Sequence, residues 1–248
     1  MITIAIANQK GGVGKTTTAV TLAHGLALKH HNVLLVDLDP QGQCAPHLGM
    51  EQEPGVFNLL VAELPLRDVA RTTGRPNLWL LPGNKRTKTA ETLMVVEAKG
   101  VDTLQSVLGE KVNGDRLHYL ILDTAPSVGG IQENALYACD ILLVPTSLDH
   151  LGLKGLMEIL KTLRAVNRPT PPEVWILPTF YDEVTRESQV NLAHLQETFG
   201  ELVLPPIHRA TVLRECPAVG RTIFEHAPES RAAEEYARLV WEVLDARE

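Results

Sequence analysis

The sequence lacks several features that would place it in a common class. Among its 248 residues there are only three cysteines, Cys44, Cys139 and Cys216, and no two of them form a CxxC pair. This spacing excludes the usual zinc and dithiol redox motifs, so we expect small buried cysteines in a reducing compartment. No apolar run approaches the roughly 18 residues that a membrane-spanning helix requires, and no basic segment followed by an apolar core opens the chain. We therefore expect a soluble cytoplasmic protein.

The sequence also lacks a basic excess. Its formal net charge is −7 and its isoelectric point is about 5.7, so the overall field repels phosphate and any nucleic-acid contact needs a local basic patch. With 44% hydrophobic residues the chain can bury a sizeable core, as one large α/β domain or two small ones. There is no internal repeat or low-complexity linker, and we expect one domain over residues 1–248.

Short apolar runs alternate with stretches that carry apolar residues at three- and four-residue spacing. Strands are expected at residues 2–7, 33–36, 119–122, 141–144 and 174–177, and helices at 16–28, 155–166, 188–199 and 232–244. Residues 42–114 are less regular, with only 78–81 strand-like. The alternation predicts an α/β fold, a mostly parallel twisted sheet with helices on both faces. Ligands of such sheets bind beyond the carboxyl ends of the strands, so the site is expected there.

The stretch KGGVGKTT, residues 10–17, follows the first expected strand and opens the first expected helix. This context predicts a phosphate-binding P-loop, in which glycines let the backbone N–H groups point inward and the helix adds its positive end. The plain pattern demands glycine at position 9, where this chain has Gln9, so the loop is a variant. The expected nucleotide-binding residues are Lys10, Gly11, Gly12, Val13, Gly14, Lys15, Thr16 and Thr17.

Two lysines stand in this loop. Lys15 is placed to reach the outer phosphates of a nucleotide, and the hydroxyl of Thr16 is a hard oxygen donor for Mg²⁺. Thr17 can add a hydroxyl to an inner phosphate. Chemistry within one chain gives Lys10 no task, and a solvated loop lysine remains an open interpretation for it.

Aspartates follow the other strands. Asp37 and Asp39 end the second strand, where alternation predicts that both lie on one face, one supporting Mg²⁺ and the other orienting an attacking water. Asp123 ends the third strand and is expected to act as the second Mg²⁺ element, generally through coordinated water. Pro145 is expected to stop the fourth strand. Asp149 precedes a helix, and a simple helix cap explains it equally well.

With KGGVGKTT, VLLVDLDPQG, LILDTAPS and VPTS…GLKGL in this order, nearly the whole chain resembles the ParA/Soj branch of the ParA/MinD deviant-Walker P-loop ATPases. The resemblance implies an ATP- and Mg²⁺-dependent enzyme with weak intrinsic hydrolysis. Lys10 would match the "signature" lysine that reaches the partner's phosphates in an ATP-bound sandwich dimer. Asp39 would be needed for hydrolysis and would join Thr16 and Asp123 at the metal. Phe180, Pro206 and His208 would lie near the adenine, and Lys10, Lys15 and Asp39 would form the catalytic set.

The same resemblance implies partners. The ATP-bound homodimer of such proteins binds DNA without sequence preference, and a ParB-like protein stimulates hydrolysis, so a nucleoid-associated protein that segregates plasmid or chromosome is expected. The candidate DNA contacts are Arg186, Arg209, Arg214 and Arg221, although a surface arginine is more often simply solvated. The resemblance begins at Met1, which predicts no N-terminal helix-turn-helix domain.

Other members of the fold class remain as alternatives. A ParA-like protein can position another cargo through an adaptor protein, such as a carboxysome or a chemoreceptor cluster. A MinD-like membrane ATPase would end in a basic amphipathic helix, whereas residues 231–248 are net acidic, so their apolar stripe is expected to pack on the sheet and no membrane contact is expected. A reductase with an intersubunit iron–sulfur cluster needs paired cysteines, and a small-molecule ligase resembling dethiobiotin synthetase has no use for Lys10.

Overall fold

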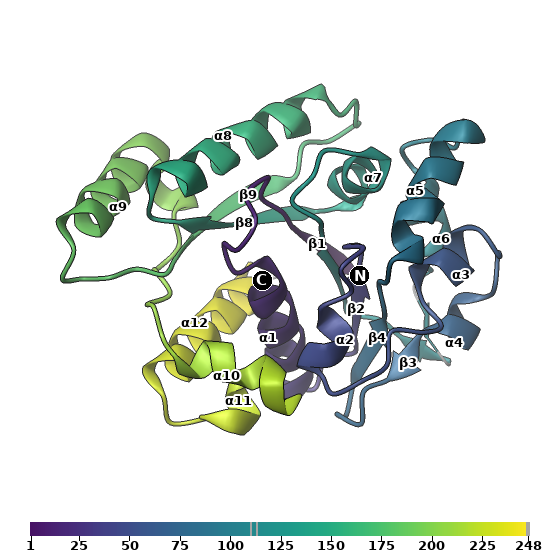
Figure 1. The fold of residues 1–248 in the computed structure, drawn as a ribbon, viewed down its shortest axis with the longest axis horizontal. Helices are drawn as coiled ribbons and strands as arrows, with labels where there is room; N and C mark the ends of the chain where they lie inside the picture. Colours follow the sequence, from purple (N-terminus) through teal and green to yellow (C-terminus); the bar gives the residue numbers. More distant parts are fainter. Residues whose placement is uncertain (110, 113, 247–248) are drawn as a thin grey trace.

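The computed structural model describes residues 1–109, 111–112 and 114–246. Its strands are β1 (Ile2–Ile6), β2 (Val33–Asp37), β3 (Arg71–Thr72), β4 (Leu78–Leu81), β5 (Lys111–Val112), β6 (Asp115–Arg116), β7 (Tyr119–Asp123), β8 (Ile141–Ser147) and β9 (Glu173–Thr179). Seven of them form one sheet in the order β3-β4-β2-β7-β1-β8-β9, parallel throughout except between β3 and β4 (Figure 1). The strands β5 and β6 form a separate antiparallel pair.

Helices cover both faces of the sheet, as Figure 1 shows. One face carries α1 (Lys15–Leu28), α2 (Cys44–His47), α10 (Val212–Val219), α11 (Ile223–His226) and α12 (Arg231–Asp245). The other side carries α3 (Val56–Leu60), α4 (Leu66–Val69), α5 (Arg86–Val96), α6 (Thr103–Val107), α7 (Gly130–Ala138), α8 (His150–Ala165) and α9 (Arg186–Phe199). A short 3-10 turn, η1 (Gly200–Leu202), follows α9. The expected α/β fold with helices on both faces is confirmed.

Burial explains why the strands are so apolar. Strands β2 and β7 are fully buried along their length, since helices cover both faces of the sheet at its centre. The last helix, α12, turns its apolar face inward, packs along α1 and shares one hydrophobic core with that face of the sheet. Gly25 of α1 permits this approach, because a Cβ there would lie 2.4 Å from a methyl group of Val240. None of the described helices combines the length and the apolar character needed to cross a bilayer.

One expectation about a strand is wrong. Pro145 does not end β8, which continues to Ser147 with Pro145 paired to Leu177 of β9. Leu143 turns its carbonyl toward β1, where it accepts from Ala7 N–H at 3.1 Å, and Pro145 faces the same side two residues later. There β1 has already ended, so the missing N–H of the proline costs no ladder hydrogen bond.

Helices α5 and α7 were not expected from the sequence pattern. The buried face of α7 includes Gln132 and Asn134, whose amides bond Ala125 O and Leu104 N–H, so its pattern is not that of an apolar stripe. Helix α5 buries only three of its residues. Both helices therefore lack the regular apolar spacing from which a helix is predicted, and the sequence pattern did not indicate them.

Candidate functional site

The loop between β1 and α1 is shaped by two glycines and anchored by its neighbours. Gly12 and Gly14 have φ of 75° and 91°, in the left-handed region, and Gly14 is the residue that starts α1. Val13 between them is buried, and its carbonyl accepts from Thr179 Oγ1 at 2.9 Å. The curled backbone that the sequence predicts is therefore present, and its position is held from the end of β9.

Lys15 points into this loop. It is 7% exposed, and its ammonium donates to the carbonyl of Lys10 at 3.1 Å. Burial lowers the pKa of Lys15, and the charges of Asp123 and Asp39 oppose that shift. A buried ammonium in a loop of backbone N–H groups suits a phosphate group, whereas the two carboxylates near it suit a cation.

The backbone of Lys10 is fixed although its charge has no close partner. Lys10 N–H donates to Asn8 Oδ1 at 2.8 Å, and α8 packs against both residues through Gly155. A Cβ at Gly155 would lie 2.2 Å from Asn8 Oδ1 and 2.9 Å from Lys10 Cβ. Within the described part of the chain, the Lys10 ammonium forms no ion pair, although it lies near enough to Asp149 for its charge to lower the pKa of that carboxyl. The backbone of Lys10 is therefore fixed, and its ammonium is not bound to a carboxylate.

Asp149 is the N-cap of α8, which decides between the two interpretations of this residue. Its Oδ1 accepts from Gly152 N–H at 2.8 Å. Burial raises the pKa of Asp149, but hydrogen bonds from Gly152, Ser147 and Leu151, together with the charge of Lys10, give a net lowering. The cap is therefore ionised at neutral pH and stabilises the start of α8.

Asp37 and Asp39 do not share a face as alternation predicts, because β2 ends at Asp37. Asp37 is fully buried, and its two carboxylate oxygens accept from Asp39 N–H at 3.0 Å and Cys44 N–H at 2.9 Å. Burial and the neighbouring Asp123 raise the pKa of Asp37 well above its usual range. Asp37 thus holds the loop that carries Asp39, and each of its oxygens already accepts a backbone hydrogen bond.

Asp39 lies in the cleft. It lines a cavity of about 270 Å³ together with the P-loop residues Gly11 to Thr17 other than Val13, and with Gln43, His47, Pro126 and Phe180. Its Oδ1 accepts from Gln41 N–H at 2.8 Å. Facing the phosphate loop across this cavity, it is the carboxylate of the pair that can meet water or a cation.

Asp123 has an oxygen without a partner. Its Oδ2 accepts from Thr16 Oγ1 at 2.7 Å and from the Cys44 thiol at 3.4 Å, whereas Oδ1 is buried with no hydrogen bond. Burial raises the pKa of Asp123 to about 6, although the Thr16 hydrogen bond and the charge of Lys15 oppose the rise. An orphaned carboxylate oxygen beside a threonine hydroxyl fits Mg²⁺, which prefers hard oxygen ligands.

A second set of groups, Asp37, Cys44 and Asp123, brings three possible ligand atoms within 4.8 Å of one another. The set does not fit a cation. Both oxygens of Asp37 are already used, and burial raises the pKa of Cys44 well above its usual range, so the thiol stays protonated. The oxygen of Asp123 that remains without a partner is Oδ1.

A larger cavity of about 360 Å³ continues from the P-loop. It is lined by Gly12, Gly14, Thr17, Thr179, Phe180, Ile207, His208, Arg209, Ala210, Leu213, Arg214, Pro217 and Tyr236. Of the three residues that the resemblance places near the adenine, Phe180 and His208 line this cavity and Pro206 does not, whereas Ile207 does. Tyr236 belongs to α12, more than two hundred residues from the loop, and nothing in the local sequence marks it. The cavity has the size and largely apolar walls of a nucleoside site.

Comparisons with known proteins agree with this geometry. A family model described as an AAA domain matches residues 1–176. The chromosome-partitioning ATPase Soj of Thermus thermophilus is 40% identical over 245 residues, covering 97% of this chain and 94% of that protein. The sporulation initiation inhibitor protein Soj of Bacillus subtilis is 36% identical over 248 residues, covering 97% of each. The chain belongs to the ParA/Soj family of P-loop ATPases.

A solved structure agrees as well. Cobyrinic acid a,c-diamide synthase of Mycobacterium smegmatis with a bound ATP analog and magnesium has a TM-score of 0.81 and 30% identity, covering 98% of this chain and 94% of that one. The present ParA/Soj protein is an ATP hydrolase that uses ATP and Mg²⁺. The unpaired Asp123 oxygen and the buried Lys15 agree with that cofactor pair.

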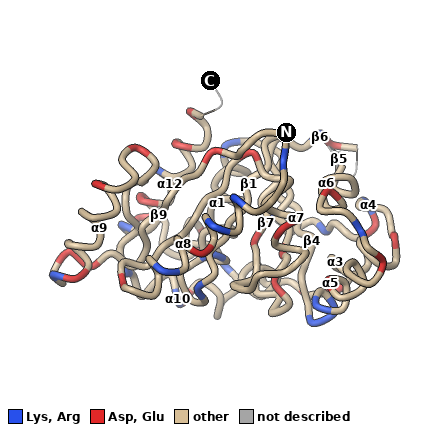
Figure 2. The backbone as a smooth tube through the Cα atoms, turned by 90° about the horizontal axis from the view of Figure 1, so that it is seen from above, with Lys and Arg blue, Asp and Glu red and all other residues tan. Residues whose placement is uncertain are grey.

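The four arginines expected to contact DNA in this ParA/Soj protein are all exposed: Arg186, Arg209, Arg214 and Arg221. Over the described residues, none of their guanidinium groups has a hydrogen bond or ion pair, unlike Arg75, which bonds Glu225 at 2.8 Å. Arg209 and Arg214 also line the larger cavity. Figure 2 shows acidic and basic positions interspersed along the chain rather than gathered in one block.

Proposed function

We propose that the protein is an ATP-dependent dimerisation switch that binds DNA without sequence preference and positions or segregates it with a ParB-like partner. In this proposal residues 1–248 act as one ATPase domain. The observation that carries it is Lys10, whose backbone is fixed by Asn8 and Gly155 while its ammonium has no ion-pair partner among the described residues. A lysine with a fixed backbone, next to the phosphate loop and without an ion-pair partner, is well used on the phosphates of a second copy.

Within one copy, different residues bind the phosphates, the nucleoside and Mg²⁺. Lys15 and the P-loop N–H groups bind the outer phosphates, and the larger cavity takes the nucleoside against Phe180 and His208. Thr16, Asp123 and Asp39 hold Mg²⁺, which when bound neutralises charge on the phosphates. Asp39 also orients the attacking water. Once the outer phosphate leaves, Lys10 loses its target and the two copies separate.

The lysines provide the test of the switch. In an Asp39→Ala background, which retains ATP, light scattering should show a dimer when ATP and Mg²⁺ are added. Lys15→Ala should lose nucleotide binding, whereas Lys10→Ala should bind nucleotide as a monomer. Identical behaviour of the two lysine variants, or no ATP-dependent dimer in Asp39→Ala, would contradict the proposal.

The DNA part rests on the exposed arginines without partners, and the relatives named for chromosome partition support it. A dimer doubles the number of cations that meet the phosphate backbone, so the acidic net charge does not prevent binding, and binding should weaken steeply with salt. Arg186→Glu should abolish ATP-dependent binding to arbitrary duplex DNA while dimerisation persists. Arg238→Glu, an equally exposed arginine on α12, is the matched control.

The partner part has a separate test. A ParB-like protein encoded beside this one should raise the hydrolysis rate of the wild type and leave the Asp39→Ala variant inactive. If stimulation requires another adaptor instead, the cargo is not DNA bound by a ParB-like protein, and this part of the proposal fails while the ATPase switch stands.

A further inference from the structure

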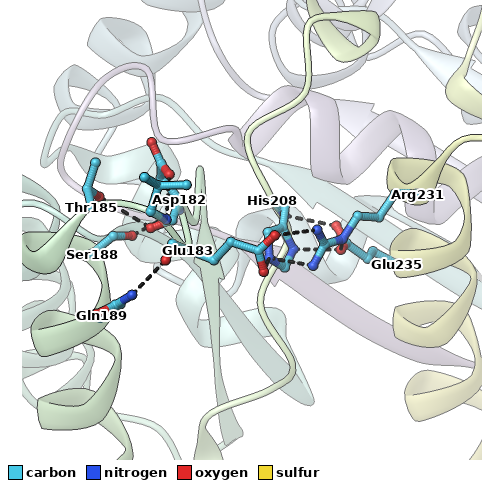
Figure 3. Close-up of polar contacts among 9 residues, drawn as sticks. Asp182, Glu183, Thr185, Ser188, Gln189, His208, Arg231 and Glu235 are labelled. Atoms are coloured by element: carbon cyan, nitrogen blue, oxygen red, sulfur yellow. Dashed lines mark hydrogen bonds and ion pairs between the residues drawn. The ribbon is translucent and has the colours of Figure 1, made fainter.

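Hydrogen bonds and ion pairs join four side chains in Figure 3: Glu183, His208, Arg231 and Glu235. One of them, His208, lines the larger cavity. Glu235 of α12 accepts from His208 N–H at 2.8 Å through Oε2, and from His208 Nδ1 at 2.6 Å through Oε1. Arg231, one turn earlier, donates to Glu235 at 2.9 Å and to His208 Nε2 at 2.7 Å. It also donates to Glu183, in the loop after β9, at 3.2 Å. The four residues join α12 to both segments that form the cavity wall.

The hydrogen-bond partners of the His208 ring determine which of its two nitrogens carries the proton. A guanidinium group only donates, so His208 Nε2 must accept, and the ring proton must lie on Nδ1, where Glu235 accepts it. Both ring nitrogens are therefore used inside the protein. His208 offers the cavity the surface of a neutral ring with a fixed orientation, and no ring N–H for a ligand.

Backbone hydrogen bonds fix the two segments that lie beside the His208 ring. Ile207 N–H donates to Pro178 O at 2.9 Å, Tyr181 N–H donates to Ile207 O at 3.0 Å, and Arg209 N–H donates to Tyr181 O at 3.0 Å. Between them, Phe180 has φ of 53°, a left-handed conformation that a non-glycine residue keeps only where its surroundings impose it. The two segments of the cavity wall, residues 178–181 and 207–209, are thus held together by backbone hydrogen bonds, and Glu235 connects them to α12 through His208.

Glu235 and Arg231 are not on the cavity lining. We propose that they are positioning residues for nucleoside recognition: they fix the tautomer and orientation of His208, and with it the wall formed by Phe180 and Ile207 to Arg209. The selectivity of the site for an adenine nucleotide then depends on two side chains that do not touch it. This inference rests on the proposed placement of the nucleoside in the larger cavity.

The variants follow from the donor order. Glu235→Gln offers one acceptor oxygen and an amide NH₂ where two N–H donors of His208 need two acceptors, so one donor loses its partner. Arg231→Met removes the donor to Nε2, and Arg231→Lys restores a donor. Glu183 is exposed, and water screens its pair with Arg231, so Glu183→Gln should change little. Glu234→Gln, an exposed neighbour of Glu235, is the matched control.

The measurement compares ligands that share phosphates but differ in the nucleoside. Dissociation constants for ADP, GDP and inorganic pyrophosphate, each with Mg²⁺, are measured by calorimetry. We expect Glu235→Gln to reduce the preference for ADP over pyrophosphate about tenfold and to lower the ADP to GDP selectivity, with pyrophosphate affinity unchanged. Arg231→Met should act in the same direction, and Arg231→Lys should restore part of the loss. Nitrogen-15 shifts of the His208 ring should show the Nδ1–H tautomer in the wild type and a changed Nε2 resonance in Arg231→Met, where Nε2 has lost its donor.

The outcomes separate this inference from the proposed function. If the wild type binds ADP no better than pyrophosphate, the nucleoside is not in the cavity, and the proposed function fails at that point. If the wild type prefers ADP and folded Glu235→Gln and Arg231→Met variants keep that preference, the positioning role is wrong. Parallel loss of ADP and pyrophosphate binding, with a lower melting temperature, would show a purely structural role and also overturn it. Should Glu235→Gln not fold, Arg231→Met carries the test, since that side chain is half exposed.

Discussion

Asp123 and Glu235 are both buried carboxylates near the nucleotide cleft. In the structure both oxygens of Glu235 accept hydrogen bonds, whereas only one oxygen of Asp123 does. Glu235 receives three hydrogen bonds, two from His208 and one from Arg231. Asp123 receives two at a single oxygen, and its second oxygen has none. A buried charge with unmet hydrogen bonds destabilises a fold unless a ligand completes it. Glu235 therefore stabilises the fold, whereas Asp123 keeps an oxygen that can bind a cation.

The largest expected difference between the two regions is in catalysis. Asp123→Asn should slow ATP hydrolysis on the order of 100-fold or more at saturating ATP, since it removes charge at the metal and the phosphates. Glu235→Gln should leave kcat within about threefold and act on KM. Steady-state kinetics over a range of ATP concentrations measures both. A fall in kcat for Glu235→Gln as large as that for Asp123→Asn would remove the distinction.

The second difference is in stability without nucleotide or Mg²⁺. Glu235→Ala should lower the free energy of unfolding by about 2–3 kcal/mol, because it leaves donors of His208 and Arg231 without an acceptor. Asp123→Asn should instead raise it by about 1 kcal/mol at pH 7.5, because the amide carries no buried charge. Urea denaturation of both variants measures the two changes. Equal destabilisation would mean that Asp123 also belongs to the framework.

A third prediction concerns Asp37, a buried carboxylate that is complete although it lies beside Asp123. Asp37→Asn keeps one acceptor oxygen for the two N–H groups of Asp39 and Cys44, so the loop bearing Asp39 should loosen. Hydrolysis should fall about tenfold with ATP affinity unchanged, as expected for a group that orients a catalytic residue. Loss of ATP binding would show that Asp37 contacts the ligand after all.

The smallest effect is in the pH dependence. Burial raises the pKa of folded Asp123 from its ordinary value of 3.8 to about 6, so folding favours the protonated form of this carboxyl. The penalty for the charged form is fully present above pH 6 and disappears as the pH falls toward 4. The roughly 1 kcal/mol gain of Asp123→Asn at pH 7.5 should therefore shrink at pH 5. A gain that is constant from pH 7.5 to 5 would contradict the raised pKa.

The sequence predicts the framework of the phosphate side well because local signals coincide there. The strand at residues 78–81 is confirmed at its bounds. The strand expected at residues 2–7 ends one residue earlier, and the other expected strands are confirmed with extensions of one to three residues. The P-loop residues, Asp39 and Asp123 meet in one cleft because parallel strands bring their carboxyl ends to one edge of the sheet. Such an argument needs only the order of strands.

The nucleoside side could not be predicted from spacing. Glu235 lies 27 residues beyond His208, and a buried glutamate on an amphipathic helix has the same local pattern as a solvated one. Asp37 was misjudged because alternation places a side chain on a face but does not show which backbone N–H groups it will meet. Pro145 was misjudged because the end of its neighbour β1 decided whether its missing N–H mattered.

The contact between Gly155 and Lys10 gives α8 a mechanical role. At Gly155 the helix lies so close to Lys10 that a hydrogen atom fits between them and a methyl group does not. Because the contact is close-packed, α8 cannot move toward the loop unless the loop moves as well. The outer side of that helix, where Leu151 and Met157 are exposed, is thus connected to the root of Lys10 through a single rigid body. A displacement of α8 toward the loop would therefore press on the backbone of Lys10, whose N–H is held by Asn8.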